Sequence, residues 1–507
     1  MNNKVSVLPD DEHNRNLVTN VHPADWENPE PAARYNLVVI GAGTAGLVAA
    51  VGSASSLHAR VALVEKHLMG GDCLNVGCVP SKAVIRSARA VGEIKNVSDF
   101  GLKLQGSIHV DFSRVMERMR QIRSRISHHD SAKRFRSLGV DVFLGEGKFK
   151  DRHSIEVEGA VLNFKKAVIA TGARPAKPPI EGLAEAGFLT NETVFSLTER
   201  PEKLVVIGGG PIGCELAQAF NRLGSKVTIV QRDSQFLPRE DPEAAAVLGK
   251  FFEKESIRCI LSAEAKKVDY NNGKKAVHIT RKNGDEIIEA DEILVGVGRI
   301  PNVEGLNLEA AGVEYDRRKG VIVNDYLQTS NSDIYAAGDI ALRHKFTHMA
   351  EAAARIVIQN ALFVKSKKYS SLLVPWCTYT DPEIAHVGMY ERDLNEKNIP
   401  FETYTRYFEE VDRALLDGEG EGFVKVHTKK GKDKIMGATI VARHAGEMIS
   451  EFTLAMFAGK GLKTLTNVIH PYPTQADAIK QVAGQYYAGK LTPFLECLLK
   501  RWFAWKR

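Results

Sequence analysis

The 507-residue sequence predicts an α/β protein with two parallel-sheet domains and a C-terminal α+β domain. Two observations support this prediction. An apolar strand, a glycine-rich turn and a helical segment follow one another in the first quarter of the chain, and the same unit recurs in the second quarter. Beyond about residue 372 the pattern changes to strand-like segments at 422–427 and 435–441, followed by helical runs at 446–458 and 474–483. The length agrees with roughly three domains.

The first unit opens with the apolar run 36–40, which is typical of a buried parallel strand. A second strand at 61–64 ends in Glu65, whose carboxylate can accept a hydrogen bond from a ribose hydroxyl. Three glycines between the strands permit a tight turn and a close approach of pyrophosphate to the helix N-terminus. They are Gly41, Gly43 and Gly46. This order is the dinucleotide-binding fingerprint of a Rossmann-like domain.

The second unit repeats this order with strands at 204–207 and 227–230, so two dinucleotide cofactors are expected. Its glycines are Gly208, Gly210 and Gly213. At the position of Glu65 it has Gln231, which is followed by two arginines. Loss of the acid and gain of arginine favour a 2′-phosphate, and hence NADPH over NADH. The alternative is that these arginines are merely exposed. They are Arg232 and Arg239.

Three further segments have the composition of cofactor contacts. A glycine beside a polar residue at the end of a buried strand suits the binding of ribose or ribitol hydroxyls. The candidates are Thr171 and Gly172, Gly298 and Arg299, and Gly338 and Asp339.

Two cysteines, Cys73 and Cys78, lie in the run 70–82 directly after the first unit. Glycines such as Gly71 let the backbone approach a cofactor, and a helix that begins at the cysteines favours a thiolate at its positive end. A five-residue separation does not fit one regular helix face, so a disulfide here needs a distorted turn and is easier to reduce. We predict a redox-active disulfide beside a flavin. The alternatives, a structural disulfide or a zinc site with His67, fit poorly because there are only six cysteines and no Cys-x-x-Cys.

The composition is that of an ordinary globular protein, with 44% apolar residues, 26% charged residues and a formal net charge of +6. This charge gives little support to nucleic-acid binding, and the arginines of a helix expected at 111–141 are interpreted as a solvated face. The first 31 residues are polar, unlike a signal peptide, and no apolar run reaches the ~20 residues of a membrane span. A cytoplasmic location and no resident metal are therefore expected.

The segment 494–507 departs from this average. Leu495, Leu498, Trp502 and Trp505 share one helical face among basic residues. Such a helix either docks on a partner subunit or domain, or lies in a membrane interface. Docking on protein is the preferred interpretation.

With these motifs in order, residues 34–490 resemble the class I pyridine nucleotide-disulfide oxidoreductases, which include dihydrolipoamide dehydrogenase, glutathione reductase and mercuric reductase. The resemblance implies a homodimer with shared active sites, and an FAD domain interrupted by an NAD(P)H domain. The implied division is an extension at 1–33, an FAD domain at 34–180 and 301–371, an NAD(P)H domain at 181–300, a dimerisation domain at 372–490 and a basic amphipathic tail at 491–507.

The resemblance also implies roles for individual residues. Cys73 is the exposed sulfur that meets substrate, and Cys78 is the charge-transfer thiolate against the flavin. Lys82 lies near flavin N5, and Glu215 is its partner. The glycines of the two fingerprints, together with Gly71, contact the cofactors.

The substrate depends on a segment near residue 470. Disulfide reductases of the family have a histidine base before Pro-Thr and a glutamate five residues later that holds its ring. Here Tyr472 occupies the histidine position and Asp477 the glutamate position, while His470 lies two residues earlier. Mercuric reductases carry tyrosine at this point. Their vicinal cysteine pair has no counterpart, because Cys497 is single.

We therefore expect an FAD-dependent, NADPH-oxidising enzyme of the mercuric reductase-like branch, with Hg(II) or a related soft metal or thiol as substrate at Cys73 and Cys78. The first alternative is a dithiol-disulfide oxidoreductase that uses His470. The second is a redox-sensing or membrane-associated flavoprotein with little turnover of free substrate.

Overall fold

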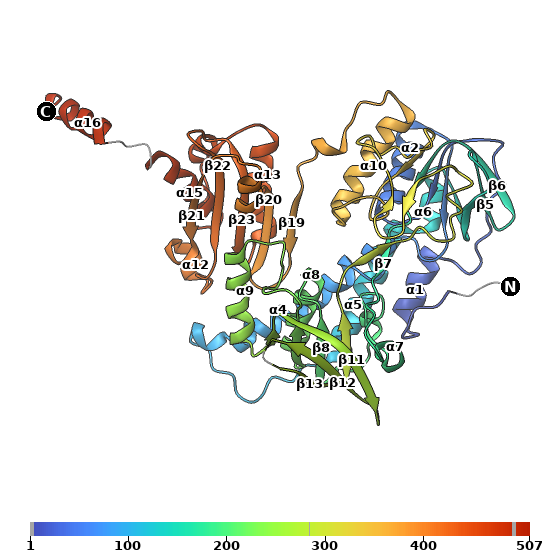
Figure 1. Cartoon of the computed structure of the whole chain (residues 1–507), viewed down its shortest axis with the longest axis horizontal. Coiled ribbons are helices and arrows are strands. Elements are labelled where there is room, and N and C mark those ends of the chain that lie inside the picture. The colour runs from blue at the N-terminus through green and yellow to red at the C-terminus, as the bar shows by residue number, and fades with distance from the viewer. Residues whose placement is uncertain (1–4, 283, 489–492) are drawn as a thin grey trace. The chain divides into compact units, whose positions relative to one another are not determined.

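The computed structural model describes residues 5–282, 284–488 and 493–507, and the chain forms two compact units (Figure 1). The first unit consists of Met1–Lys95, Leu104–Asp233 and Cys259–Leu372. The second unit consists of Asn96–Lys103, Ser234–Arg258 and Leu373–Arg507. Parallel sheets occur in the first unit and an antiparallel sheet with helices in the second, so the predicted fold class is confirmed.

The first parallel sheet has β1 at its centre, paired with β2 on one side and β6 on the other. Leu37 and Val39 of β1 enter the core that contains α2 and α10, whereas Val38 and Ile40 enter the core on the opposite face. The run is continuously apolar because both faces of this sheet are covered. The parallel strands and flanking helices are β1 (Tyr35–Ile40), β2 (Val61–Glu65), β3 (Val140–Leu144), β6 (Ala160–Ile169), β18 (Ile334–Ala336), α1 (Glu12–Val21), α2 (Thr44–Leu57), α6 (Ala132–Ser137) and α10 (Thr347–Leu362). An antiparallel extension comprises β4 (Gly147–Phe149) and β5 (Ser154–Val157).

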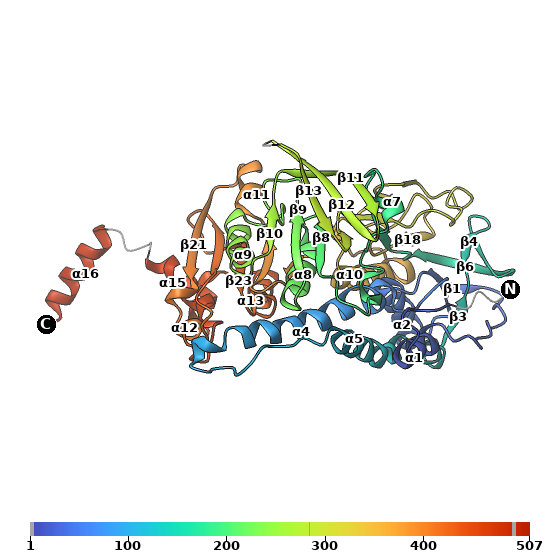
Figure 2. The same cartoon turned by 90° about the horizontal axis from the view of Figure 1, so that it is seen from below.

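The second parallel sheet has the strand order β10-β9-β8-β14. Its central strand β8 runs parallel to both β9 and β14. Figure 2 shows α4 running beside α5 and α8, and α4 packs against both. The elements are β8 (Lys203–Ile207), α8 (Pro211–Arg222), β9 (Lys226–Val230), β10 (Arg258–Ile260), β14 (Glu292–Val295), α3 (Gly71–Asn75), α4 (Cys78–Lys95), α5 (Phe112–Ser127) and α7 (Leu183–Ala186). Small antiparallel sheets are formed by β11 (Ala263–Asn271), β12 (Lys274–Arg281) and β13 (Glu286–Ala290), by β7 (Ala173–Pro175) and β15 (Arg299–Pro301), and by β16 (Tyr315–Asp316) and β17 (Gly320–Val321).

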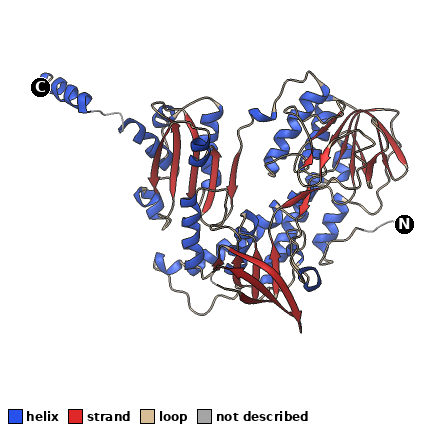
Figure 3. Ribbon diagram, viewed as in Figure 1, coloured by secondary structure: helices blue, strands red, loops and turns tan. Residues whose placement is uncertain are grey.

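The second unit contains a five-stranded antiparallel sheet in the order β19-β20-β23-β22-β21, whose strands stand side by side in Figure 3. Helix α13 packs on β20 and β23, and α15 packs on β21 and β22. The elements are α9 (Pro242–Lys254), β19 (Pro375–Thr378), β20 (Glu383–Gly388), α11 (Glu391–Glu396), β21 (Phe401–Tyr407), α12 (Asp412–Leu416), β22 (Phe423–Lys429), β23 (Ile435–Ala442), α13 (Ala445–Phe457), α14 (Leu462–Asn467), α15 (Asp477–Ala488) and α16 (Pro493–Trp505).

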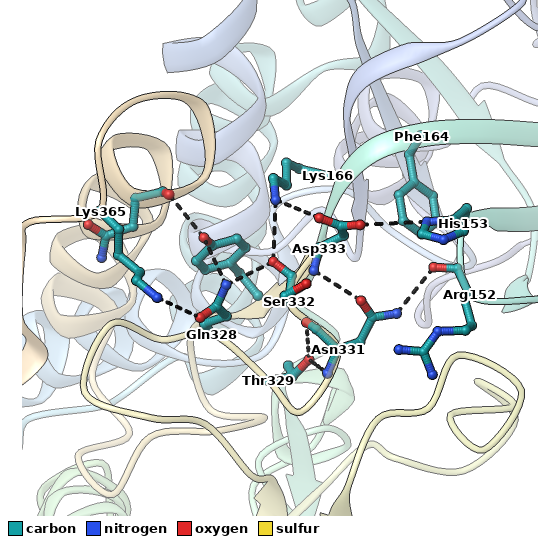
Figure 4. Close-up of polar contacts among 12 residues, drawn as sticks. Arg152, His153, Phe164, Lys166, Gln328, Thr329, Asn331, Ser332, Asp333 and Lys365 are labelled. Atoms are coloured by element: carbon teal, nitrogen blue, oxygen red, sulfur yellow. Dashed lines mark hydrogen bonds and ion pairs between the residues drawn. The ribbon is translucent and has the colours of Figure 1, made fainter.

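A polar network fixes the turn that precedes β18 (Figure 4). Lys166 of β6 donates through Nζ to Asp333 at 2.6 Å, and His153 lies 3.7 Å from the same carboxylate. Asn331 donates to the Arg152 carbonyl at 3.2 Å and accepts from the Asp333 N–H at 3.0 Å. This network fixes the start of the strand that ends just before Gly338 and Asp339.

Two expectations from the sequence are wrong. The helix expected at 111–141 ends at Ser127, because Ser131 caps a new helix and β3 begins at Val140. Its arginines do not all face solvent, since Arg120 and Arg123 are buried. They are buried because α1, within the first 33 residues, packs against α5.

Candidate active site

The first glycine loop leaves no room for side chains. A Cβ on Gly46 would lie 1.8 Å from the Gly41 carbonyl oxygen, and Gly41 itself has a φ of +100°. Gly43 occupies the N-cap of α2. A Cβ on Gly71 would lie 2.6 Å from the Cα of Gly43, so the backbone ahead of the cysteines touches the loop directly. The Ala42 N–H of this loop donates to Glu65 at 2.6 Å, and burial raises the pKa of Glu65.

A second carboxylate lies beside this loop. A Cβ on Gly338 would lie 3.3 Å from the Ala45 side chain, which places Gly338 and Asp339 against the first turn of α2. Arg299 lies 3.3 Å from Asp339 and also pairs with Asp72, which precedes the first cysteine. Burial raises the pKa of Asp339.

The remaining candidates of the first site lie where β7 and β15 pair. Thr171 donates to the Asn302 carbonyl and Asn302 donates back to the Thr171 carbonyl, each at 2.9 Å. Gly172 and Gly298 both have positive φ, and a Cβ on either would meet nothing within 4 Å. The two connections between the parallel sheets are thereby fastened together.

The second glycine loop repeats the first. A Cβ on Gly213 would lie 2.0 Å from the Gly208 carbonyl oxygen, and Gly210 is the N-cap of α8. The Gly209 N–H donates to Gln231 at 2.7 Å, and Gln231 donates to Asp233 at 2.7 Å. The Gln231 side chain thus accepts a hydrogen bond from the second glycine loop, as the Glu65 carboxylate does from the first.

The two arginines expected at this site are both exposed. Arg232 follows Gln231 in the first unit, whereas Arg239 belongs to the second compact unit. The carbonyl of Arg239 accepts a hydrogen bond from Arg392 in that unit.

The two cysteines are free thiols on consecutive helices, Cys73 within α3 and Cys78 at the first residue of α4. In this chain Cys73 is half-buried and Cys78 is exposed, whereas the resemblance implies Cys73 as the exposed sulfur. Gly77 completes the short connection between the helices, where a Cβ would lie 2.7 Å from the Asp72 carbonyl oxygen. The Cys78 sulfur lies 3.3 Å from the Thr347 hydroxyl at the start of α10.

The pKa values of the two cysteines are shifted in opposite directions. The hydrogen bond from the Cys73 thiol lowers the pKa of Cys78 to about 6, with help from the Thr347 hydroxyl and the charge of Lys82. That same hydrogen bond and burial raise the pKa of Cys73. Lys82 lies one turn along α4 from Cys78 and donates to Glu215 of α8 at 2.7 Å. Glu215 is buried, with only 6% of its side chain exposed.

Several residues that hold the cysteine segment were missed by the sequence analysis. Arg123 donates to the Asn75 carbonyl at 2.6 Å and to the Asn14 side chain of α1 at 2.7 Å. Asn191 donates to the Val76 carbonyl at 3.3 Å. Burial lowers the pKa of Arg123 to about 10. In the sequence this role is indicated only by the position of Arg123 beside the apolar face of the helix Phe112–Ser127.

The segment around residue 470 lies in the second unit. Tyr472 is 73% exposed and donates to Asp412 at 2.9 Å, which raises the pKa of the tyrosine. Asp477, at the position of the family's glutamate, accepts a hydrogen bond from Gln481 at 2.6 Å. Its place in the first turn of α15 directs it along that helix.

His470 has partners on both ring nitrogens. Nε2 lies 3.0 Å from Glu451, and Nδ1 lies 3.3 Å from the Val468 carbonyl. Only 5% of its side chain is exposed. Both nitrogens face acceptors, so this geometry presents no ring nitrogen to a substrate.

The sequence matches the family described as pyridine nucleotide-disulphide oxidoreductase over residues 35–354, and the dimerisation domain of that family over residues 374–483. The chain belongs to this family. Family members use FAD and a pyridine nucleotide, and this protein is a flavin-dependent disulfide oxidoreductase.

Its relatives have two different named activities. The chain is 36% identical to a mercuric reductase of Staphylococcus aureus, covering 89% of this chain and 82% of the relative. It is 34% identical to a dihydrolipoyl dehydrogenase of Mycoplasma pneumoniae, covering 88% and 97%. Among solved structures, the HOCl-induced flavoprotein disulfide reductase RclA from Escherichia coli superposes with a TM-score of 0.78 at 27% identity, covering 89% of this chain and 99% of that one.

The residues present fit FAD. Gly43 and Gly71 carry no side chain where their backbones meet at the start of α2. A pyrophosphate can therefore approach the N-terminal N–H groups of that helix. Two carboxylates, Glu65 and Asp339, flank this point, as hydroxyl groups of the cofactor require.

Within residues 5–282, 284–488 and 493–507, no helix is both long and apolar enough to cross a membrane. No cluster of three or more His, Cys, Asp or Glu residues there is arranged to hold a metal ion.

Proposed function

We propose that this protein oxidises NADPH and passes electrons through FAD to the pair Cys73 and Cys78, where Hg(II) or a related soft metal ion is bound and reduced. The observation that carries the proposal is the unequal pair of sulfurs, with the pKa of Cys78 lowered to about 6 beside Lys82. At neutral pH one sulfur is then a thiolate and the other a thiol.

FAD, when bound, would supply the conversion of a hydride from the nicotinamide into an electron pair for the sulfurs. Gly41, Gly43, Gly46, Gly71, Glu65 and Asp339 would hold it. Lys82 would place a positive charge near its ring, and Glu215 would orient that lysine. Thr347 would hold the Cys78 thiolate in place.

The reaction balances without a further reductant. A disulfide between Cys73 and Cys78 takes two electrons and two protons to become two thiols, and NADPH becomes NADP⁺. A soft cation bound by both thiolates displaces the two thiol protons. The next two electrons from NADPH reduce Hg(II) to Hg(0), which leaves both sulfurs free.

The partners of Tyr472 and His470 favour a metal over a disulfide substrate. Thiol exchange needs a base that can take and return a proton, and His470 has acceptors at both nitrogens. Tyr472 is exposed, and its hydrogen bond to Asp412 raises its pKa, so it acts as a hydrogen-bond donor at neutral pH. Mercuric reductases among the relatives and the Cu(II) complex of RclA agree with soft-metal chemistry.

NADPH and a homodimer are part of the same proposal. Where the first half has the carboxylate of Glu65, the second half has the neutral side chain of Gln231, and the next residue is the exposed cation Arg232. A carboxylate at this position would bind the ribose 2′-hydroxyl, whereas an arginine suits a 2′-phosphate. The match to the family's dimerisation domain supports a homodimer, in which Tyr472 would reach Cys73 of the other subunit.

The test is NADPH consumption by the flavin-loaded protein with Hg(II) in excess thiol, compared with lipoamide and glutathione disulfide. We expect turnover with Hg(II), a loss of that turnover in Cys73→Ser, and no effect of His470→Ala. Brisk turnover of either disulfide with none of Hg(II) would reject the metal substrate.

Dithiol-disulfide exchange is the second candidate function, favoured by the 34% identity to a dihydrolipoyl dehydrogenase. It would need His470 as the general base, with one ring nitrogen released from its present partner. In this case His470→Ala would abolish lipoamide turnover, while Tyr472→Phe would leave it unchanged.

A further inference from the structure

Helix α16 presents an apolar face that lies open to solvent. Every residue from 494 to 507 is exposed, including Phe494 at 78% and Trp505 at 76%. The preferred interpretation of this segment from the sequence is docking on a partner subunit or domain, and within this single chain the helix side chains are exposed.

The helix separates its apolar and charged residues. At 100° per residue, six large apolar side chains fall within less than half of the circumference. They are Phe494, Leu495, Leu498, Leu499, Trp502 and Trp505. The opposite side carries Lys500 and Arg507 with a single carboxylate, Glu496, while Arg501 and Phe503 flank the two edges of the apolar arc. Lys506 lies over the ring of Trp502 at 5.1 Å.

The geometry points to one occupant: we infer that α16 lies in the plane of a lipid surface that contains anionic headgroups. Tryptophan and phenylalanine on one face, with lysine and arginine on the other, are typical of helices that bury their apolar face at the headgroup boundary. The excess of cations complements anionic lipids. With 13 residues the helix is roughly 20 Å long, too short to cross a bilayer.

This inference is independent of the substrate. It would place a reductase at a membrane surface through its basic and aromatic C-terminal helix.

The experiment is flotation of the full-length flavin-loaded protein with vesicles of phosphatidylcholine alone or mixed with phosphatidylglycerol. We expect binding to the anionic vesicles to exceed that to neutral ones by roughly tenfold at low salt and to fall as salt is raised. Leu498→Glu should reduce binding by a similar factor, because it places a charge on the apolar face.

Ala504→Glu is the matched control. It makes the same change in net charge on the opposite side of the helix and should retain most of the binding. Equal binding by wild type and Leu498→Glu, or no binding by wild type, would overturn the proposal. So would a halving of the mass of Leu498→Glu in sedimentation, because the face would then be covered by a second copy. Retained flavin content in each variant shows that the fold is intact.

Discussion

The two dinucleotide-binding halves of the first unit have similar glycine loops, but they differ in the side chain that accepts the loop N–H, which is Glu65 in one half and Gln231 in the other. In the first half the loop N–H of Ala42 donates to Glu65 at 2.6 Å, and in the second the N–H of Gly209 donates to Gln231 at 2.7 Å. The N-cap glycines have φ values of −77° and −78°. Glycine therefore sets the loop, and the residue at the end of the second strand sets the charge that the ligand meets.

The halves also differ in their surroundings. The cysteine segment lies against the first loop, through Gly43 and Gly71. The second half reaches that segment through side chains: Glu215 of α8 pairs with Lys82, and Asn191 donates to the Val76 carbonyl. In the proposed function, the first half would hold the group that exchanges electrons with sulfur, and the second would deliver electrons to it.

The largest effects are expected from substitutions that disrupt one glycine loop at a time. Gly46→Ala places a Cβ 1.8 Å from the Gly41 oxygen, and Gly213→Ala places one 2.0 Å from the Gly208 oxygen. We expect the first variant to purify without flavin, and the second to keep flavin but not respond to NADPH, each with a loss of at least about 1–3 kcal/mol of stability. Absorbance spectra check both. Gly484→Ala, whose Cβ meets nothing within 4 Å, should behave as wild type.

A smaller effect comes from making the second half resemble the first. Gln231→Glu with Asp233→Asn gives residue 231 a carboxylate and avoids placing it against the acid that Gln231 now contacts. We expect the ratio of kcat/KM for NADPH over NADH to fall by about tenfold or more, because a charge-assisted contact is worth about 1.5–3 kcal/mol. An unchanged ratio would show that residue 231 does not select the nucleotide.

Arg123 supports the cysteine segment from within the first half. Arg123→Met leaves the Asn75 carbonyl and the Asn14 side chain without their donor, and should cost about 1–3 kcal/mol of unfolding free energy. Chemical denaturation measures this. The exposed Arg125→Met is the control and should be within about 0.5 kcal/mol of wild type.

The smallest expected effect is on the pKa of Cys78, and it comes from Lys82 and Glu215, which pair across the two halves. In the reduced protein Cys78 should be alkylated with a pH midpoint near 6, because its pKa is lowered to about 6. Lys82→Met removes a cation that stabilises the thiolate and should move the midpoint upward. Glu215→Gln removes a carboxylate that destabilises it and should move the midpoint downward. Shifts of the same sign in both variants would contradict these electrostatic roles.

The sequence was sufficient for the fold class because continuous apolar strands and glycine loops are local patterns. Gly41, Gly46, Gly208 and Gly213 must be glycine for steric reasons that a spacing reveals. The role of Arg123 could not be predicted, because it depends on α1 and α3 meeting from residues far apart in the chain. The partner of Tyr472 was missed for the same reason, since Asp412 lies 60 residues away.

In the proposed function the second half feeds electrons to the first, and the first passes them to Cys78. An anaerobic titration of the flavin-loaded protein with NADPH tests it most directly. We expect the first equivalent to produce the long-wavelength absorbance of a thiolate beside oxidised flavin, with no such band in Cys78→Ser. Complete bleaching of the flavin by the first equivalent in wild type, without that band, would contradict the account.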